Sequence, residues 1–383
     1  MKRNSPDALR PLVKSMSPQE KEVAKQVIVG FNRKFGDYEP KTLKLFQFIS
    51  DNTNLGNFDD EQVKNLLFPE MDEATFGKLT SRLREKLFES LILDVNLDRK
   101  GMYQPSWLVR QKARKSLITA EILSIRNQRD KAEKLIRKTI RECQKHELYD
   151  LLIGLNHISF INTCNVKGGE RTAQNFEDFQ SYLEKERLKK TAEMHMYKYA
   201  FYGINRASAK PNPKDVLKDI QKIEHALENG PEVPSAQYFL LQLKTVYWEL
   251  KGNFNNQVRF ARQLRHLFVQ YPHLSSDIRN INAYLQEFTA LLNLNVHKQA
   301  LEAVREAQKL AVPGTSSYFE ITKNQVYPLI HLGRLHEARQ IIEDLLDDER
   351  VQGLMQEKLR YLLCVVLREN GQYGLVSRTL MEL

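Results

Sequence analysis

The sequence predicts an all-α protein in which about seven antiparallel helix hairpins stack into an α-solenoid behind an N-terminal helical domain. Apolar residues recur at three- and four-residue intervals over most of the 383-residue chain, as on the buried face of a helix. Turn-like positions also recur at intervals of 38 to 43 residues, and a fixed period of this size is typical of stacked helical repeats. These positions are Asn127, Gly168–Gly169, Lys210–Pro213, Gly252, Asn295, Gly333 and Gly371.

The N-terminal domain, residues 1–100, shows short helical segments without a repeat. Ser17 and Glu20 are spaced as a helix cap, which predicts a helix from there to about Phe31. Further helices are expected around residues 43–49, over residues 59–67, and from Asp72 to about Leu91. The favoured interpretation is a helical cap on the repeat stack. The alternative is a helix-turn-helix that exposes a row of cations on its longest helix. That row comprises Lys78, Arg82, Arg84 and Lys86.

The boundary between the domains is expected at residues 98–105, where glycine and proline lie close together with little apolar periodicity. Residues 106–383 then form the repeat domain. A single hairpin cannot bury its apolar face, whereas stacked hairpins bury a continuous core and expose a long surface suited to binding a partner.

Five of the predicted turns are flanked by a pattern of small and large apolar residues. The matching positions are Ala120, Leu123 and Ala132; Trp248, Gly252 and Phe254; Leu291 and Ala300; Leu329, Gly333 and Ala338; and Leu367, Gly371 and Tyr373. On these residues the chain resembles the tetratricopeptide repeat superfamily over about residues 110–383. Val326, Phe288 and Thr245 depart from that family's small residue, and the period is longer than 34 residues. The segment Lys14–Lys21, followed by Leu45–Ile49, also looks like the front end of uncharacterised bacterial repeat proteins, a resemblance that implies no activity. The resemblance implies a tetratricopeptide-like fold and a protein-binding role.

Composition and charge narrow the class of protein. The chain is 42% hydrophobic and 28% charged, and it contains no apolar run of membrane-spanning length. Three widely spaced cysteines, Cys143, Cys164 and Cys364, fit a reducing compartment, so we expect a cytoplasmic protein. Because no apolar run of spanning length occurs, we also expect no membrane binding. The net charge of +10 arises in the first part of the chain: residues 1–210 carry 38 Lys and Arg against 28 Asp and Glu, whereas residues 211–383 carry 20 of each.

No pattern in the chain indicates catalysis, a metal or a cofactor. The two glycines Gly168 and Gly169 lack the following residues of a phosphate-binding loop, and no nucleophilic serine motif occurs. His331 and His336 are five residues apart across a turn, a spacing that does not favour a metal site. We therefore expect a protein that is not an enzyme.

The strongest charge feature is the stretch from Arg110 to Lys145, which contains twelve basic residues and four acids. In the second helix of this hairpin, five cations at three- and four-residue steps share one face. They are Lys131, Lys134, Lys138, Arg141 and Lys145. The favoured interpretation is a solvated outer face. The functional interpretation is a binding surface for an acidic peptide, with nucleic acid less favoured because aromatic residues are not interleaved with the cations.

An aromatic cluster occupies residues 194–202. Core packing is the favoured interpretation, because Tyr197, Phe201 and Ile204 recur at helical spacing. The functional interpretation places Tyr199 and Tyr202 in a groove that anchors a partner.

Taken together, these features predict a non-enzymatic scaffold or adaptor that binds a protein or peptide on its repeat surface. The alternative is a transcription regulator with DNA-binding helices in residues 1–100 and a repeat sensor domain. The last helix, through Leu383, lacks a polar capping helix, so we expect either association with another subunit there or a chain that continues beyond Leu383.

Overall fold

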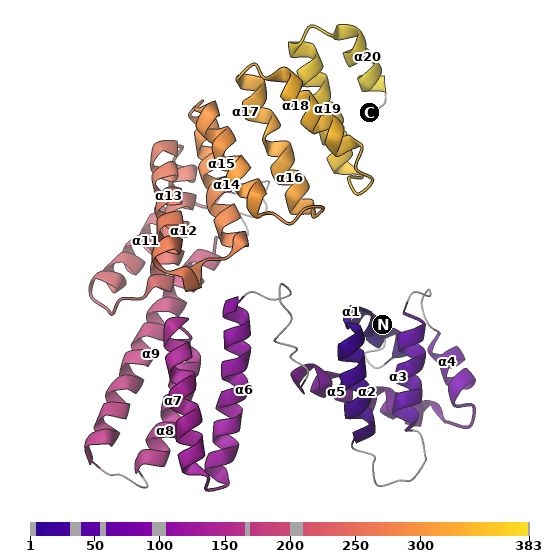
Figure 1. Ribbon diagram of the computed structural model, residues 1–383, viewed down its shortest axis with the longest axis vertical. Coiled ribbons are helices and arrows are strands. Elements are labelled where there is room, and N and C mark those ends of the chain that lie inside the picture. The colour runs from indigo at the N-terminus through magenta and orange to yellow at the C-terminus, as the bar shows by residue number, and fades with distance from the viewer. Residues whose placement is uncertain are drawn as a thin grey trace. The chain divides into compact units, whose positions relative to one another are not determined.

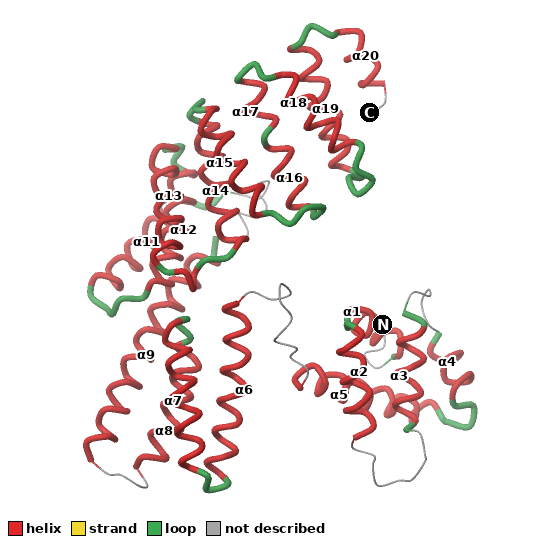
Figure 2. Tube along the Cα trace, viewed as in Figure 1, coloured by secondary structure: helices red, strands yellow, loops and turns green. Residues whose placement is uncertain are grey.

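The computed structural model describes residues 5–30, 40–53, 59–93, 105–164, 169–199 and 210–381. Every regular element within these residues is a helix, and Figure 2 shows the helices joined by loops without a strand in the described part. The predicted all-α class is therefore confirmed. The chain divides into two compact units, residues 1–103 and 104–383, and each is described by itself below.

The first unit contains five helices among its described residues (Figure 1). They are α1 (Pro6–Ser15), α2 (Pro18–Gly30), α3 (Lys41–Asp51), α4 (Asp60–Leu67) and α5 (Glu73–Leu93). Helix α5 packs against α2 and α3, and its Leu83 and Leu87 are fully buried together with Phe46 of α3. The long amphipathic helix expected from Asp72 thus supplies one wall of this unit's core.

The helix cap predicted at Ser17 forms as expected, and Asp72 caps the start of α5. The Ser17 backbone N–H donates to Glu20 Oε2 at 2.6 Å, and the Glu20 N–H donates to Ser17 Oγ at 3.2 Å, which makes a reciprocal capping box. Asp72 accepts a hydrogen bond from the backbone N–H of Thr75 at 2.8 Å. These caps pair N–H groups that the first turn of a helix leaves without an internal partner.

The second unit continues with α6 (Pro105–Ile125), α7 (Arg129–Lys145), α8 (Tyr149–Cys164) and α9 (Gly169–Tyr197) (Figure 1). It proceeds through α11 (Pro213–Glu228), α12 (Pro234–Leu250), α13 (Phe254–Gln270), the 3₁₀ helix η1 (Pro272–Leu274), α14 (Asp277–Asn293) and α15 (His297–Leu310). It ends with α16 (Ser316–Asn324), α17 (Val326–His331), α18 (Leu335–Leu346), α19 (Leu354–Glu369) and α20 (Tyr373–Met381). Each helix contacts mainly the helices next to it in the sequence.

The turns between paired helices lie where the sequence predicts them. The backbone adopts positive φ at Asn127, Gly252, Asn295, Gly333 and Gly371, each of which separates two packed helices. Glycine enters this left-handed region without steric cost, and asparagine tolerates it better than most residues. The expected turn at Gly168 lies outside the described residues, and α9 begins directly after it at Gly169. The expected turn at Lys210–Pro213 lies where α11 begins, at Pro213.

Small and aliphatic side chains fill the spaces between these helices. One buried cluster spans α6 to α12 and includes Ala120, Ile136 and Leu152, and another spans α13 to α19 and includes Ala300, Leu329 and Ala338. Alanine at such positions lets two helix backbones approach closely, so Ala338, which the repeat pattern singles out, serves packing. Among the described residues, no helix has both the length and the apolar character that crossing a membrane requires.

Candidate functional site

The outer face of α7 carries the five cations that the sequence places together. All five of these side chains are exposed, whereas Ala132 and Ile136 on the opposite face are buried in the core. We call this surface the α7 basic face, and it consists of Lys131, Lys134, Lys138, Arg141 and Lys145.

Most of the cations on the α7 basic face have no acid close by. Lys145 lies 2.9 Å from Glu142, and that hydrogen bond lowers the pKa of the Glu142 carboxyl. Within the described part of the chain, Lys131, Lys134 and Arg141 have no acid within 4 Å. Clustered cations of this kind attract anionic ligands over a distance set by the Debye length, about 8 Å at physiological ionic strength.

The aromatic expectations need correction at two residues. Tyr199, expected to line a groove, is only 6% exposed, and its hydroxyl donates to Asp219 Oδ2 at 2.7 Å. Tyr197, expected in the core, is 56% exposed. α9 ends at Tyr197, so Tyr199 lies in the turn after the helix, where the helical period no longer applies. Phe201, Tyr202 and Ile204 lie outside the described residues.

The cations on α5 are not presented as the helix-turn-helix alternative requires. Lys78 and Arg82 are exposed, but Arg84 and Lys86 are partly buried. Lys86 donates to the Ile28 carbonyl at 2.9 Å, and burial lowers the pKa of its ammonium group. The four residues therefore do not form one exposed row.

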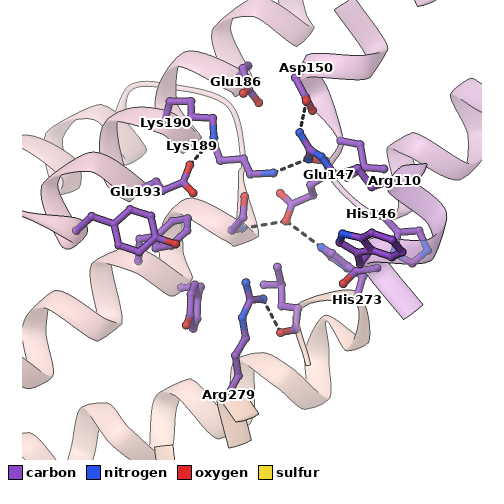
Figure 3. A pocket seen from close by; sticks show the side chains of 18 residues that line it. Arg110, His146, Glu147, Asp150, Glu186, Lys189, Lys190, Glu193, His273 and Arg279 are labelled. Atoms are coloured by element: carbon purple, nitrogen blue, oxygen red, sulfur yellow. Dashed lines mark hydrogen bonds and ion pairs between the residues drawn. The ribbon is translucent and has the colours of Figure 1, made fainter. Parts of the chain in front are cut away.

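A pocket with a cavity volume of about 380 Å³ lies within the second unit (Figure 3). We call it the α9 pocket, because α9 supplies more of its wall than any other helix. Its lining residues come from α6, α8, α9, α12, η1, α14 and the α7–α8 turn. They are Ser106, Trp107, Arg110, His146, Glu147, Leu148, Asp150, Glu186, Lys189, Lys190, Glu193, Tyr197, Ser235, Tyr238, Phe239, His273, Leu274 and Arg279.

Glu147 is the buried acid of this pocket. It occupies the α7–α8 turn with φ of 50°, and its side chain is almost fully buried. Its Oε2 accepts from the Ser235 backbone N–H at 3.0 Å and lies 2.9 Å from His273 Nε2, while Oε1 accepts from the Tyr149 hydroxyl at 3.0 Å. Ser235 is in the first turn of α12, where a negative charge is favoured by the helix dipole. Glu147 thus joins the α7–α8 turn to α12 and η1.

The cations of the pocket each have a partner within the described chain (Figure 3). Arg110 pairs with Asp150, and Lys190 lies 2.6 Å from Glu193. Lys189 Nζ donates to the Glu147 carbonyl at 2.7 Å, and Arg279 donates to the Leu274 carbonyl at 2.7 Å. Formal charges in the lining balance, with four cations facing four carboxylates.

Burial moves two pKa values in the pocket toward the neutral forms. It raises the pKa of the Glu186 carboxyl and lowers the pKa of the Lys189 ammonium. These groups are three residues apart on α9, yet they form no ion pair within 4 Å. Desolvation disfavours the charged form of any group that its surroundings do not compensate.

Two imidazoles lie edge to face at the other side of the pocket. The ring centroids of His146 and His273 are 6.3 Å apart, and burial together with the charge of His273 lowers the pKa of His146. In the described residues, no group of three His, Cys, Asp or Glu side chains is arranged to hold a metal ion. The chemistry that the pocket offers is therefore hydrogen bonding and charge pairing next to aromatic rings.

Sequence reasoning did not find the α9 pocket, because its residues are spread from Ser106 to Arg279. No periodic pattern connects them, and no short motif marks Glu147. The one usable signal is the run of six residues at 145–150, in which two acids and a histidine interrupt an apolar pattern at the point where one hairpin passes to the next.

Comparison with known proteins identifies no relative: no protein-family model, curated protein or solved structure matches the chain.

Proposed function

We propose that the protein is a cytoplasmic, non-enzymatic adaptor that binds an acidic segment of a partner protein on the α7 basic face. In this proposal residues 104–383 form a tetratricopeptide-like solenoid of helix hairpins, whose stacked helices hold α7 rigidly at the surface. Contacts that run mainly between neighbouring helices, together with the regularly spaced turns, support that arrangement.

One observation carries the proposal: the α7 basic face presents cations one helical turn apart, and Lys131, Lys134 and Arg141 have no acid within 4 Å in the described chain. A structural surface helix usually intersperses acids among its cations at the same spacing, because opposite charges at i and i+4 stabilise a helix. An acidic peptide would supply the missing charges, and its association would be steered electrostatically.

The test uses the full chain as bait in an affinity purification from its native cells, followed by mass spectrometry. A triple variant with Lys134→Glu, Lys138→Glu and Arg141→Glu should lose the partners that contain acidic segments. At low salt, a synthetic peptide of the acidic segment should then bind the wild type at least tenfold more tightly than it binds the variant. Its affinity for the variant should also depend less on the salt concentration.

A matched control reverses three exposed lysines elsewhere in the second unit, Lys214→Glu, Lys218→Glu and Lys298→Glu. This control has the same net charge as the α7 variant, so it should keep the partner if the location of the cations matters. Equal recovery by both variants, or no specific partner at low and moderate salt, would refute the proposal.

A further inference from the structure

Helix α6 carries apolar side chains on two opposite faces. On one face Ala113 and Ala120 are buried in the core cluster that spans α6 to α12. On the other face Ile118, Ile122 and Ile125 are 54%, 44% and 82% exposed. The contacts of α6 run mainly to α7 and α8, on the side of the buried alanines. A helix that is apolar on two sides is normally covered on both, so the second face has the composition of an interface.

The three exposed isoleucines form a narrow stripe. They are four and three residues apart, so at about 3.6 residues per turn their side chains lie within about 60° of one another. The stripe extends over about 10 Å of the helix, at about 1.5 Å per residue. This spacing is that of the seam between two packed helices, whereas a helix that lies on a membrane has a broad apolar face. The stripe therefore favours a helix as the molecule that covers it.

A cation stands at each end of the stripe. Arg114 precedes Ile118 by four residues, and Arg126 follows Ile122 by four residues, so each arginine lies one helical turn from an isoleucine. Both arginines are exposed, and within the described residues neither has an acid within 4 Å. We call the three isoleucines and these two arginines the α6 outer face.

The charge of α6 decides what kind of helix fits. From Pro105 to Ile125 it contains four basic residues and one acid, Glu121. The basic residues are Arg110, Lys112, Arg114 and Lys115. A second copy of the chain would bring the same excess of positive charge to the interface, and like charges placed opposite each other oppose association. A helix with acids beside its apolar stripe would instead attract the arginines while it covers the isoleucines.

We propose that the α6 outer face binds an acidic amphipathic helix of a partner protein. The apolar residues of that helix cover Ile118, Ile122 and Ile125, and its acids pair with Arg114 and Arg126. The two helix axes then lie about 8–10 Å apart, as in other packed helix pairs. This site does not depend on the α7 basic face, which consists of cations alone and selects a partner by charge without an apolar seam.

Photo-crosslinking in the native cells identifies what covers the α6 outer face. The full chain carries p-benzoylphenylalanine in place of Ile122, and the cross-linked segment is sequenced by mass spectrometry. We expect one segment of another protein in which acids flank an apolar stripe of helical spacing. The control carries the same residue in place of Ile278 of α14, which is also exposed, and it should not capture that segment.

A synthetic peptide of the captured segment then tests the individual contacts. It should bind the full chain and gain helical circular dichroism when it is bound. Ile122→Asp should weaken binding about tenfold or more, because it places a charge in the apolar seam. Ile122→Leu, which keeps the seam apolar, should bind like the wild type. The matched control Ile278→Asp makes the same charge change at another exposed isoleucine and should also bind like the wild type.

Two further variants complete the set. Arg114→Glu combined with Arg126→Glu should weaken binding about tenfold at low salt and make the affinity less dependent on salt. Ile125→Asp changes the most exposed isoleucine of the stripe and takes the place of Ile122→Asp if that variant is poorly folded by circular dichroism.

The proposal is overturned if the cross-linker at residue 122 captures nothing, a lipid, a second copy of the chain, a segment of its own chain, or a segment without acids. It is also overturned if Ile122→Asp and Ile125→Asp both bind the peptide like the wild type. The charge-reversal variant of the α7 basic face should keep the peptide. If only that variant loses the peptide, the segment belongs to the α7 basic face, so this inference fails while the proposed function stands.

Discussion

The α7 basic face and the α9 pocket contain the same kinds of charged side chain in opposite settings. On α7 the cations are exposed and lie side by side, so water and salt screen them and they contribute little to stability. In the pocket Glu147 is almost fully buried and accepts hydrogen bonds from two helices and an imidazole. The difference separates two uses of charge: the exposed cations are available to a partner, whereas Glu147 holds the structure together.

The largest effect should come from Glu147→Ala, which leaves the Ser235 N–H, the His273 ring and the Tyr149 hydroxyl without their acceptor. We expect the free energy of unfolding to fall by about 3 kcal/mol, as when one member of a buried charged network is removed. Urea denaturation measures the change. Glu142→Ala on the exposed surface of α7 is the control and should cost no more than about 0.5 kcal/mol. A loss below about 1 kcal/mol for Glu147→Ala would contradict a structural role for this carboxylate.

Glu186→Gln should have a smaller effect of the opposite sign. Burial raises the pKa of this carboxyl above its ordinary value of 4.5, so the folded protein binds the proton more tightly than the unfolded chain does. The penalty of the charged form is absent below pH 4.5 and develops as the pH rises through the folded pKa.

The glutamine variant should therefore be more stable than the wild type at pH 7.5 and equally stable at pH 4. Urea denaturation at the two pH values checks this, with Glu184→Gln as the control. A variant less stable than the wild type at pH 7.5 would mean that the ionised carboxylate stabilises the fold, contrary to the burial argument.

The smallest effect should come from the α7 basic face. Replacing Lys134, Lys138 and Arg141 together with alanine should change the free energy of unfolding by less than about 1 kcal/mol, because these side chains are exposed. Thermal melting and urea denaturation measure it. A larger loss would show that the cations stabilise the fold, and the comparison between the two regions would then no longer hold.

The sequence predicts local features of this fold better than it predicts the pocket. The turns at Asn127, Gly252, Asn295, Gly333 and Gly371 were predictable because a reversal between packed helices favours residues that tolerate positive φ. The capping box at Ser17 was predictable because its partners are three residues apart. Each of these features depends on residues that are close in the chain.

The features that the sequence did not predict were missed for equally physical reasons. Glu147 adopts positive φ without being glycine or asparagine, and its hydrogen-bond partners lie as far along the chain as Ser235 and His273, so nothing in its neighbourhood marks it. Tyr199 was misplaced because a helical period applies only as far as the helix extends, and α9 ends at Tyr197. The pocket can be found only once the helices have been placed in space.

The hydrogen bonds of Glu147 also bear on how the second unit unfolds. Helices that contact mainly their neighbours in the sequence can open one after another from the ends of the chain. Glu147 joins the α7–α8 turn to Ser235, 88 residues later, and to His273, 126 residues later. We therefore expect the amide hydrogens of α7, α8 and α12 to exchange in one cooperative event and those of α18 to α20 to exchange earlier. Hydrogen exchange followed by mass spectrometry would detect this, and Glu147→Ala should make the first group exchange in separate steps.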